Sequence, residues 1–316
     1  MTTSELIKDY LAARRAHGVK LSSSQRTLYQ FARETSDLPL AQVTPEAVAN
    51  FLHGSALSAS WTTKYWVLAG LYRFAMARGY AAKSALPEQR PMLPPPLVPH
   101  VYSSDELRRL LDATAILESP ISPLQALTYR TLLLLLYGAG LRVGEAIRLT
   151  LRDVNLHERV LTILGTKFYK SRLVPIGPQL AAALTTYIER RGALLTTLGD
   201  RSAFLSTRSG HGLRYQRVNM LFRRVRARAR IVCSPGELQL PRLHDLRHTA
   251  ATHRVVAWYR DGEDVQQLLP HLATYLGHVS INSTQRYLQM TPELLHEASL
   301  RFAAYAQVNE EELDHA

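Results

Sequence analysis

The chain has 316 residues, a length that allows about two domains with separate hydrophobic cores. Its apolar fraction of 46% and charged fraction of 20% are typical of soluble globular proteins, and the longest apolar run, near 132–136, is too short to cross a bilayer. The formal net charge of +12 favours a polyanionic partner. Because Cys233 is the sole cysteine, an intrachain disulfide and a zinc site of several thiolates are both excluded.

The first part of the chain, residues 1–86, is predicted to form a small all-helical domain. Apolar side chains recur at helical spacing in three segments, 4–16, 23–34 and 58–78. Thr44 and Pro45 have the pattern of a helix start, with an N-cap residue followed by proline at the first helical position. Six prolines then crowd residues 87–100, which indicates an extended linker.

The remaining residues, 101–316, are predicted to form a mainly helical domain with one small β-hairpin or sheet. Ser103 to Glu106 has the pattern of a capping box, and helical patterns follow it to about Leu151. Two short β-like runs, Val160–Leu164 and Leu173–Ile176, then flank a turn with a basic tip. Helical patterns resume after the second run.

Four short segments of this second domain contain candidate catalytic residues. They are Gly138–Glu145, the hairpin tip with Lys167 and Lys170, His244–Thr249, and Leu276–His278 followed by Tyr287. Taken alone, each segment has an ordinary structural explanation, such as a turn, a solvated hairpin tip or a helix C-cap. Their significance depends on their occurring together.

His244 and His248 require a separate test, because two histidines four residues apart can bind zinc on one helical face. A metalloprotease has glutamate directly after the first histidine, where this chain has Asp245. The positive charge of Arg247, between the two histidines, would also oppose a bound dication. We therefore expect neither a metal nor another cofactor.

Together the four segments supply two arginines, two histidines, a lysine and a tyrosine, the side chains that metal-free phosphodiester transesterification requires. Two guanidinium groups can hold the negative charge that gathers on the non-bridging oxygens of the transition state. A tyrosine hydroxyl, with a free pKa of about 10, needs a base in order to attack at neutral pH. The departing sugar oxygen needs a proton, which arginine cannot supply because it stays charged in proteins.

The positions of the lysines indicate where that proton comes from. From residue 101 onwards the chain contains many arginines and only two lysines, Lys167 and Lys170, and both lie at the predicted hairpin tip. A codon-level drift toward arginine does not explain why this turn keeps lysine. We expect lysine chemistry there, and either side chain could reach the leaving oxygen.

In their order and spacing these motifs resemble those of the tyrosine recombinase (phage integrase) family, and the resemblance covers nearly the whole chain. It implies that residues 1–86 form a helical, SAM-like core-binding domain that clamps DNA. It also implies that residues 101–316 form the catalytic domain with a C-terminal tail. The interval between Arg247 and His278 is longer than most members of the family show, and the extra residues lie around Asp261–Tyr275.

The resemblance also assigns roles within the four segments. Matched by motif, the catalytic residues are the transition-state arginines Arg142 and Arg247, the general acid Lys167, the histidines His244 and His278, and the nucleophile Tyr287. Glu145 matches the acidic residue that supports Arg142, three positions before it on a helix. Lys167 is preferred over Lys170 on this match. A further set of basic residues is expected to bind DNA: Lys64, Lys170, Arg172, Arg217, Arg223 and Arg224.

The reaction implied by the resemblance stores the energy of the phosphodiester. Tyr287 attacks a DNA phosphate, which gives a 3′-phosphotyrosyl bond and a free 5′-hydroxyl, so that neither ATP nor a metal is needed. A type IB topoisomerase uses the same side chains and is one alternative function. A non-catalytic DNA-binding regulator of the same fold is the other.

The expected partners follow from this reaction. They are a double-stranded DNA recombination site, three further copies of the chain in a tetramer on paired sites, and accessory recombination proteins. The apolar segment 300–306 near the C-terminus is expected to dock on a neighbouring copy, with packing on its own domain as the alternative. The N-terminus lacks the apolar stretch of a signal peptide, so we expect a cytoplasmic, nucleoid-associated protein with no membrane partner.

Overall fold

The structure is a computed structural model of the chain, and it describes residues 1–17, 22–53, 59–89, 91, 98–164, 171–195, 199–233, 239–277 and 299. The chain forms two compact units, one from the described residues up to 91 and the other from those at 98 and beyond. Within these ranges, every helix is too short or too polar to span a membrane.

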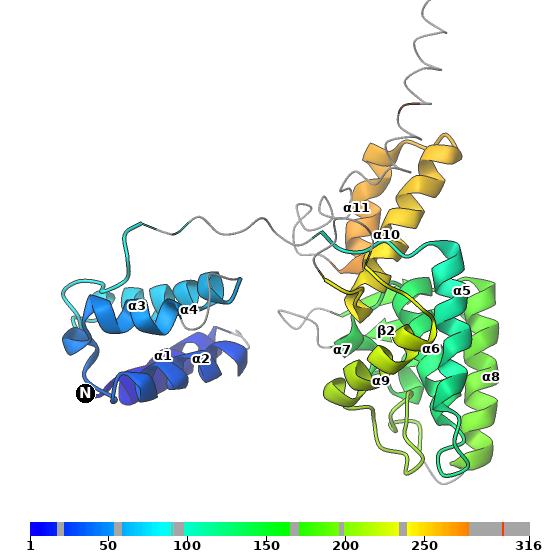
Figure 1. The fold of residues 1–316 in the computed structure, drawn as a ribbon, viewed down its shortest axis with the longest axis horizontal. Helices are drawn as coiled ribbons and strands as arrows, with labels where there is room; N and C mark the ends of the chain where they lie inside the picture. Colours follow the sequence, from blue (N-terminus) through cyan, green and yellow to red (C-terminus); the bar gives the residue numbers. More distant parts are fainter. Residues whose placement is uncertain are drawn as a thin grey trace, which may run out of the picture. The chain divides into compact units, whose positions relative to one another are not determined.

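The first unit consists of packed helices (Figure 1), and they enclose an apolar core. Its elements are α1 (Thr3–Ala16), α2 (Ser22–Glu34), the short 3₁₀ helix η1 (Leu40–Gln42), α3 (Pro45–His53) and α4 (Ala59–Ala77). The rings of Phe31 and Phe51 meet edge to face, with centroids 5.1 Å apart, and join α2 to α3. The three helices predicted from spacing are confirmed, and so is the helix start at Thr44, whose hydroxyl accepts from the Ala47 amide.

The second unit is mainly helical with one small sheet, as predicted (Figure 1). Its helices are α5 (Ser104–Asp112), η2 (Ala113–Leu117), α6 (Gln125–Gly138), α7 (Val143–Ala146), η3 (Leu151–Asp153), α8 (Pro178–Leu194), α9 (Tyr215–Arg228), α10 (Leu243–Arg260) and α11 (Val265–Leu276). Helix α6 is apolar on most sides, because it packs against both α8 and α10. The predicted capping box between Ser103 and Glu106 opens α5.

Three short strands form an antiparallel sheet in the order β1 (Val154–Asn155), β2 (Val160–Ile163) and β3 (Arg172–Pro175). The register pairs Leu161 with Val174 and Ile163 with Arg172. Leu161, Ile163 and Val174 are buried, as expected for alternate positions on strands with one face on the core. The two predicted strands are confirmed to within a residue, whereas β1 is too short to show an alternating pattern. The turn between β2 and β3 lies outside the described residues.

The long interval after Arg247 is helical. Helix α10 continues to Arg260, the chain turns at Gly262 with a φ of +74°, and α11 runs back from Val265. Helix α11 ends at Gly277, which has a φ of +69°, a left-handed conformation that glycine adopts without the strain of a Cβ atom. The interval is therefore a helical hairpin, and its last residue, Gly277, directly precedes residue 278 in the sequence.

Candidate active site

The first segment of the site follows α6, where the chain turns sharply. Gly140 has a φ of +59°, and a Cβ atom added to it would lie 2.8 Å from Cδ2 of Leu276. The left-handed backbone favours glycine here, and the absence of a Cβ atom leaves room for the side chain of Leu276 on α11. Arg142, two residues later, is the N-cap residue of α7 and faces the end of α11.

Glu145 is buried among three arginines. Its carboxylate accepts from the backbone nitrogen of Arg142 at 2.9 Å and from Nη1 of Arg142 at 2.7 Å. Arg172 donates to the two carboxylate oxygens through Nη1 at 3.1 Å and Nη2 at 2.9 Å, and Nη1 of Arg247 lies 3.7 Å away. Burial alone raises the pKa of this carboxyl, but the hydrogen bonds from Arg172 and Arg142 outweigh it and lower the pKa to about 2. Glu145 is thus an ionised centre that holds three cations together.

The same three arginines bind the C-terminal end of α11. Three consecutive carbonyls each accept from a different arginine: Tyr275 from Nε of Arg172 at 3.0 Å, Leu276 from Nη2 of Arg247 at 2.5 Å, and Gly277 from Nη2 of Arg142 at 3.0 Å. The last carbonyls of a helix have no partner within the helix, and they carry the negative end of its dipole. The end of α11 therefore orients the three guanidinium groups, with one carbonyl for each.

Arg142 and Arg247 differ in their access to solvent. The side chain of Arg142 is 39% exposed, whereas that of Arg247 is 1% exposed. Nη1 of Arg247 also donates to the carbonyl of Gly140 at 2.7 Å, which ties α10 to the turn after α6. The structure brings the two arginines together around one carboxylate, although they are 105 positions apart in the sequence.

Helix α10 begins with an arginine–carboxylate pair that has the same three-residue spacing as Arg142 and Glu145. Asp245 accepts from the backbone nitrogen of Arg242 at 2.7 Å and from its Nη2 at 2.9 Å. Between these two residues lies His244, which is exposed to a groove of about 710 Å³ between α9 and the start of α10. Partial desolvation of the imidazole and then the charge of Arg247 lower the pKa of His244. The ring is therefore neutral at pH 7 and able to accept a proton.

His248, one turn further along α10, is buried, and burial lowers its pKa to about 4. The two histidines thus differ, since His244 faces the groove and His248 lies in the core. In the part of the chain that the structure describes, no group of three or more histidine, cysteine, aspartate or glutamate side chains could hold a metal ion.

Helix α9 presents a basic face to the solvent. Its inner face is apolar, with Val218, Leu221, Phe222 and Val225 buried in the core. Its outer positions include the exposed arginines Arg217, Arg223 and Arg224. Arg223 also lines the groove that contains His244. The basic face of α9 is therefore continuous with the wall of the candidate site.

Two residues that we expected to bind DNA have other contacts. The guanidinium group of Arg172 is held by Glu145 and Tyr275, and its side chain is 11% exposed. The ammonium of Lys64 donates to the carbonyl of Phe51 at 2.6 Å and lies 4.4 Å from the centre of that ring. In this structure both side chains are held by contacts within the chain, and their expected contact with DNA stays a prediction.

Four of the sequence-derived candidates lie outside the described residues, namely Lys167, Lys170, His278 and Tyr287. The described residues stop next to two of them on the chain. Arg172 is two positions after Lys170, and Gly277 directly precedes His278. The segment 300–306, expected to dock on a neighbouring copy, lies outside the described residues as well.

Sequence reasoning missed the pair formed by Arg242 and Asp245 and the contribution of the α11 carbonyls. The pair has the same three-residue spacing as Arg142 and Glu145, so the repeated pattern could have revealed it. The carbonyls had no such signal, because every residue type has one.

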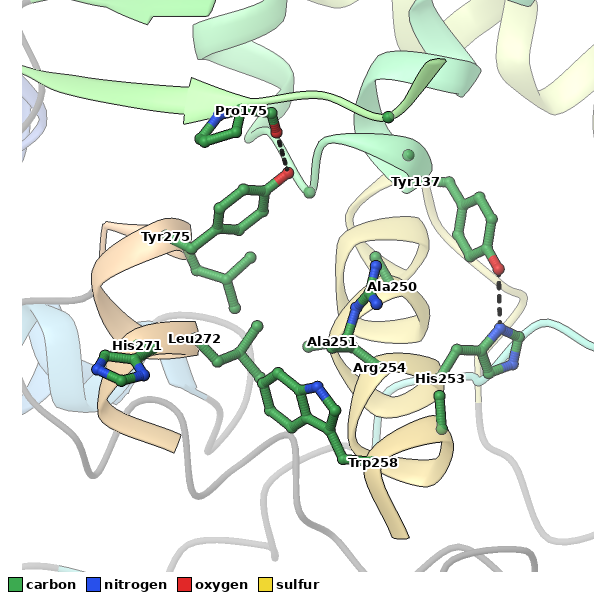
Figure 2. Close-up of a pocket in the computed structure, with 15 residues that line it drawn as sticks. Tyr137, Pro175, Ala250, Ala251, His253, Arg254, Trp258, His271, Leu272 and Tyr275 are labelled. Carbon is green, nitrogen blue, oxygen red and sulfur yellow. Dashed lines mark hydrogen bonds between the residues drawn. The ribbon is translucent and has the colours of Figure 1, made fainter. Parts of the chain in front are cut away.

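A pocket next to the arginine cluster shows how α11 is held (Figure 2). Its volume is about 690 Å³, and it is lined by residues of α6, β3, α10 and α11. The hydroxyl of Tyr275 donates to the carbonyl of Pro175 at 3.2 Å, which joins α11 to β3. The hydroxyl of Tyr137 and Nδ1 of His253 lie 3.0 Å apart, which joins α6 to α10.

Comparison with known proteins places this chain in a family. Residues 101–293 match the model of the phage integrase family. The chain is 35% identical over 310 residues to a putative integrase/recombinase, y4rB, of Sinorhizobium fredii, covering 95% of this chain and 96% of that protein. It is 32% identical over 293 residues to the tyrosine recombinase XerD of Mycobacterium tuberculosis, covering 88% and 89%.

Solved structures show the same fold. The chain superposes on the Tn1549 transposon integrase with a TM-score of 0.67 and 15% identity, over 97% of this chain and all of that one. It superposes on lambda integrase with a TM-score of 0.66 and 18% identity, over 91% and 95%.

The chain therefore belongs to the phage integrase family of tyrosine recombinases. It is a site-specific recombinase, an enzyme that cleaves and rejoins DNA.

Proposed function

We propose that this recombinase cleaves duplex DNA at defined sites through a 3′-phosphotyrosyl bond to Tyr287. The oxygen of Tyr287 attacks the phosphorus in line, the bond from phosphorus to the 5′-oxygen breaks, and that oxygen leaves as a hydroxyl. Rejoining reverses these steps with the 5′-hydroxyl of the partner strand. The observation that carries this proposal is the convergence of Arg142 and Arg247 on Glu145.

The arginine cluster is suited to the negative charge of the transition state. Two preorganised guanidinium groups lower the cost of charge on the non-bridging oxygens, because their orientation is fixed before the reaction. Arg142, at 39% exposure, is open to a phosphate. Arg247 is 1% exposed, so its contact with the phosphate requires that DNA binding make it accessible. His278, next to Gly277 in the sequence, would add a hydrogen bond.

The two proton transfers are assigned to different side chains. The neutral imidazole of His244, exposed in its groove, assists removal of the proton from Tyr287. The ammonium of Lys167 donates the proton that the 5′-oxygen takes up, with Lys170 contacting phosphate beside it. The energy of the broken phosphodiester stays in the tyrosyl ester, so the reaction consumes no ATP.

We also propose that four copies act on two paired DNA sites, with accessory proteins, at the nucleoid in the cytoplasm. Related structures show a lambda integrase dimer bound to a core site and a tetramer bound to a Holliday junction. The exposed arginines of α9 supply the phosphate contacts of the second unit. The first unit, as the core-binding domain, would contact the same duplex.

Sequencing the DNA ends trapped in covalent adducts identifies the site, and a plasmid assay then tests the function. Plasmids carrying two copies of the site should yield recombinant circles, whereas plasmids without it should stay supercoiled. Relaxation of any supercoiled plasmid, without recombinants, would instead support a type IB topoisomerase activity. DNA binding without adducts would support a non-catalytic regulator.

A further inference from the structure

Arg172 is the residue at which three separate parts of the second unit meet. It is the first residue of β3, and its side chain reaches both the start of α7 and the end of α11. Nη1 and Nη2 make a two-point contact with Glu145, and Nε donates to the carbonyl of Tyr275. A planar fork with fixed donor directions is required for this combination, which lysine cannot reproduce.

The contact between β3 and α11 is made at both ends of the strand. Arg172 binds the backbone of Tyr275 at the start of β3, and the hydroxyl of Tyr275 donates to Pro175 at its end (Figure 2). The last turn of α11 is thus aligned along the strand. The carbonyls of Leu276 and Gly277, in the same turn, accept hydrogen bonds from Arg247 and Arg142.

Gly277 lies directly against Arg172. A Cβ atom added at Gly277 would be 2.8 Å from Nη1 and 3.0 Å from Cζ of Arg172. The guanidinium group therefore packs against the backbone of the residue before His278. Its position leaves little freedom for that backbone to move.

We propose that Arg172 is a positioning residue for DNA cleavage, which acts through Glu145 and the end of α11 to orient Arg142 and Arg247. This inference rests on the proposed function and replaces the expectation that Arg172 binds DNA. Arg172 lies five positions after Lys167 in the sequence, and its contacts fix the start of β3 to α7 and α11. Arg172 thereby connects the strand that follows the lysine to both arginines.

A direct contact of Arg172 with phosphate is disfavoured by the charges around Glu145. To bind phosphate, the guanidinium group would have to leave a buried carboxylate that it contacts at two points. Removing a partner from a buried charge is costly. Arg142, which is more exposed, can meet a phosphate and keep its bond to Glu145.

The test compares Arg172→Gln and Arg172→Lys with wild type in single-turnover cleavage, using the full chain and a DNA duplex that carries its site. For Arg172→Gln we expect the cleavage rate at saturating DNA to fall by about 10–100-fold, because a misplacement of catalytic groups by about 1 Å can cost about 100-fold. The Kd for DNA and its salt dependence should stay as in wild type. Arg172→Lys should lose about tenfold, because lysine keeps the charge and lacks the fork.

Two further variants separate positioning from general damage. In Arg172→Gln the acid-induced loss of stability, followed by urea unfolding, should begin at higher pH, because Glu145 loses the hydrogen bond that most lowers its pKa. In a Glu145→Gln background, the same substitution should have a smaller effect on the rate than in wild type, since the contact between the two residues is already weakened. Arg190→Gln, at an exposed position on α8, is the matched control and should leave the rate and Kd unchanged.

Several results would overturn the proposal. One is a weaker Kd and a flatter salt dependence for Arg172→Gln with an unchanged rate at saturation, which would make Arg172 a phosphate ligand. Another is a wild-type cleavage rate for Arg172→Lys. If thermal unfolding shows that Arg172→Gln does not fold, the rate of Arg172→Lys alone tests the proposal. Effects of Arg172→Gln and Glu145→Gln that multiply would also contradict it. Failure of the proposed function is distinct, because wild type itself would then form no adduct through Tyr287.

Discussion

The carbonyl of Gly277 accepts a hydrogen bond from Nη2 of Arg142 at 3.0 Å, across 135 positions of sequence. Through this bond the turn after α6 and the end of α11 are joined directly beside position 278. Arg142 therefore has two fixed partners, a carboxylate on its own helix and a carbonyl on another. Disturbing either partner should change the orientation of the arginine without removing its charge.

Gly277→Ala should lower both stability and cleavage. The left-handed backbone costs alanine about 1 kcal/mol, and the new Cβ atom would clash with Arg172 at 2.8 Å. Gly262→Ala is a matched control, because Gly262 has a φ of +74° with open space around its Cα atom. Urea unfolding should show that the strained backbone destabilises both variants. Single-turnover assays should show slower cleavage only in Gly277→Ala. Equal cleavage rates for the two would argue against a role for this contact.

Glu145→Gln should destabilise the protein most at neutral pH. The carboxyl has a pKa of about 2 in the folded protein against an ordinary value of 4.5. Because the folded value is lower, its ionisation contributes stability above about pH 4.5, and that contribution disappears as the pH falls toward 2. Its size is on the order of 3 kcal/mol. Urea unfolding from pH 7 to pH 2 should show the two proteins converging in acid.

Glu189→Gln, at an exposed position on α8, is the control for this comparison and should follow wild type at every pH. A difference between Glu145→Gln and wild type that persists unchanged at pH 2 would mean that packing, not charge, is responsible.

The exposed arginines of α9 should determine how strongly DNA binding depends on salt. Each phosphate contact that is removed should reduce the slope of log K against log salt by about 1. We expect this of Arg223→Gln and Arg224→Gln in fluorescence anisotropy, with a slope of wild-type size for Arg190→Gln. Slopes that match wild type in both α9 variants would remove this helix from the DNA interface.

His244 should give the cleavage rate an acid limb. Its pKa is lowered from the ordinary value of 6.5, so the imidazole is neutral at pH 7 and becomes protonated only in more acidic solution. The rate should therefore fall with a midpoint that lies below this ordinary value. In His244→Gln the rate should be about 100-fold lower and this limb absent. Persistence of the limb in that variant would assign it to another group.

The fold was largely predictable because its signals are local. The helix start at Thr44, the capping box at Ser103 and the two strands of the hairpin each depend on neighbouring residues. The strand β1 escaped prediction because two residues show no periodicity.

The composition of the site stays a prediction, and its contacts could not be predicted. Motifs single out Arg142 and Arg247, but their partners on α11 are backbone carbonyls, which no residue type marks. The side chain of Arg172 contacts Glu145, 27 positions earlier, a long-range contact that sequence spacing does not reveal.

The most direct test of the whole account is the identity of the residue that becomes linked to DNA. Wild type, Tyr287→Phe and the control Tyr259→Phe are incubated with a nicked duplex that carries the site, and adducts are digested and analysed by mass spectrometry. In wild type and in Tyr259→Phe we predict a nucleotide that is linked to Tyr287 through its 3′-phosphate. Tyr287→Phe should bind the DNA with unchanged affinity and form no adduct. An adduct in Tyr287→Phe, or one on another residue in wild type, would contradict the account.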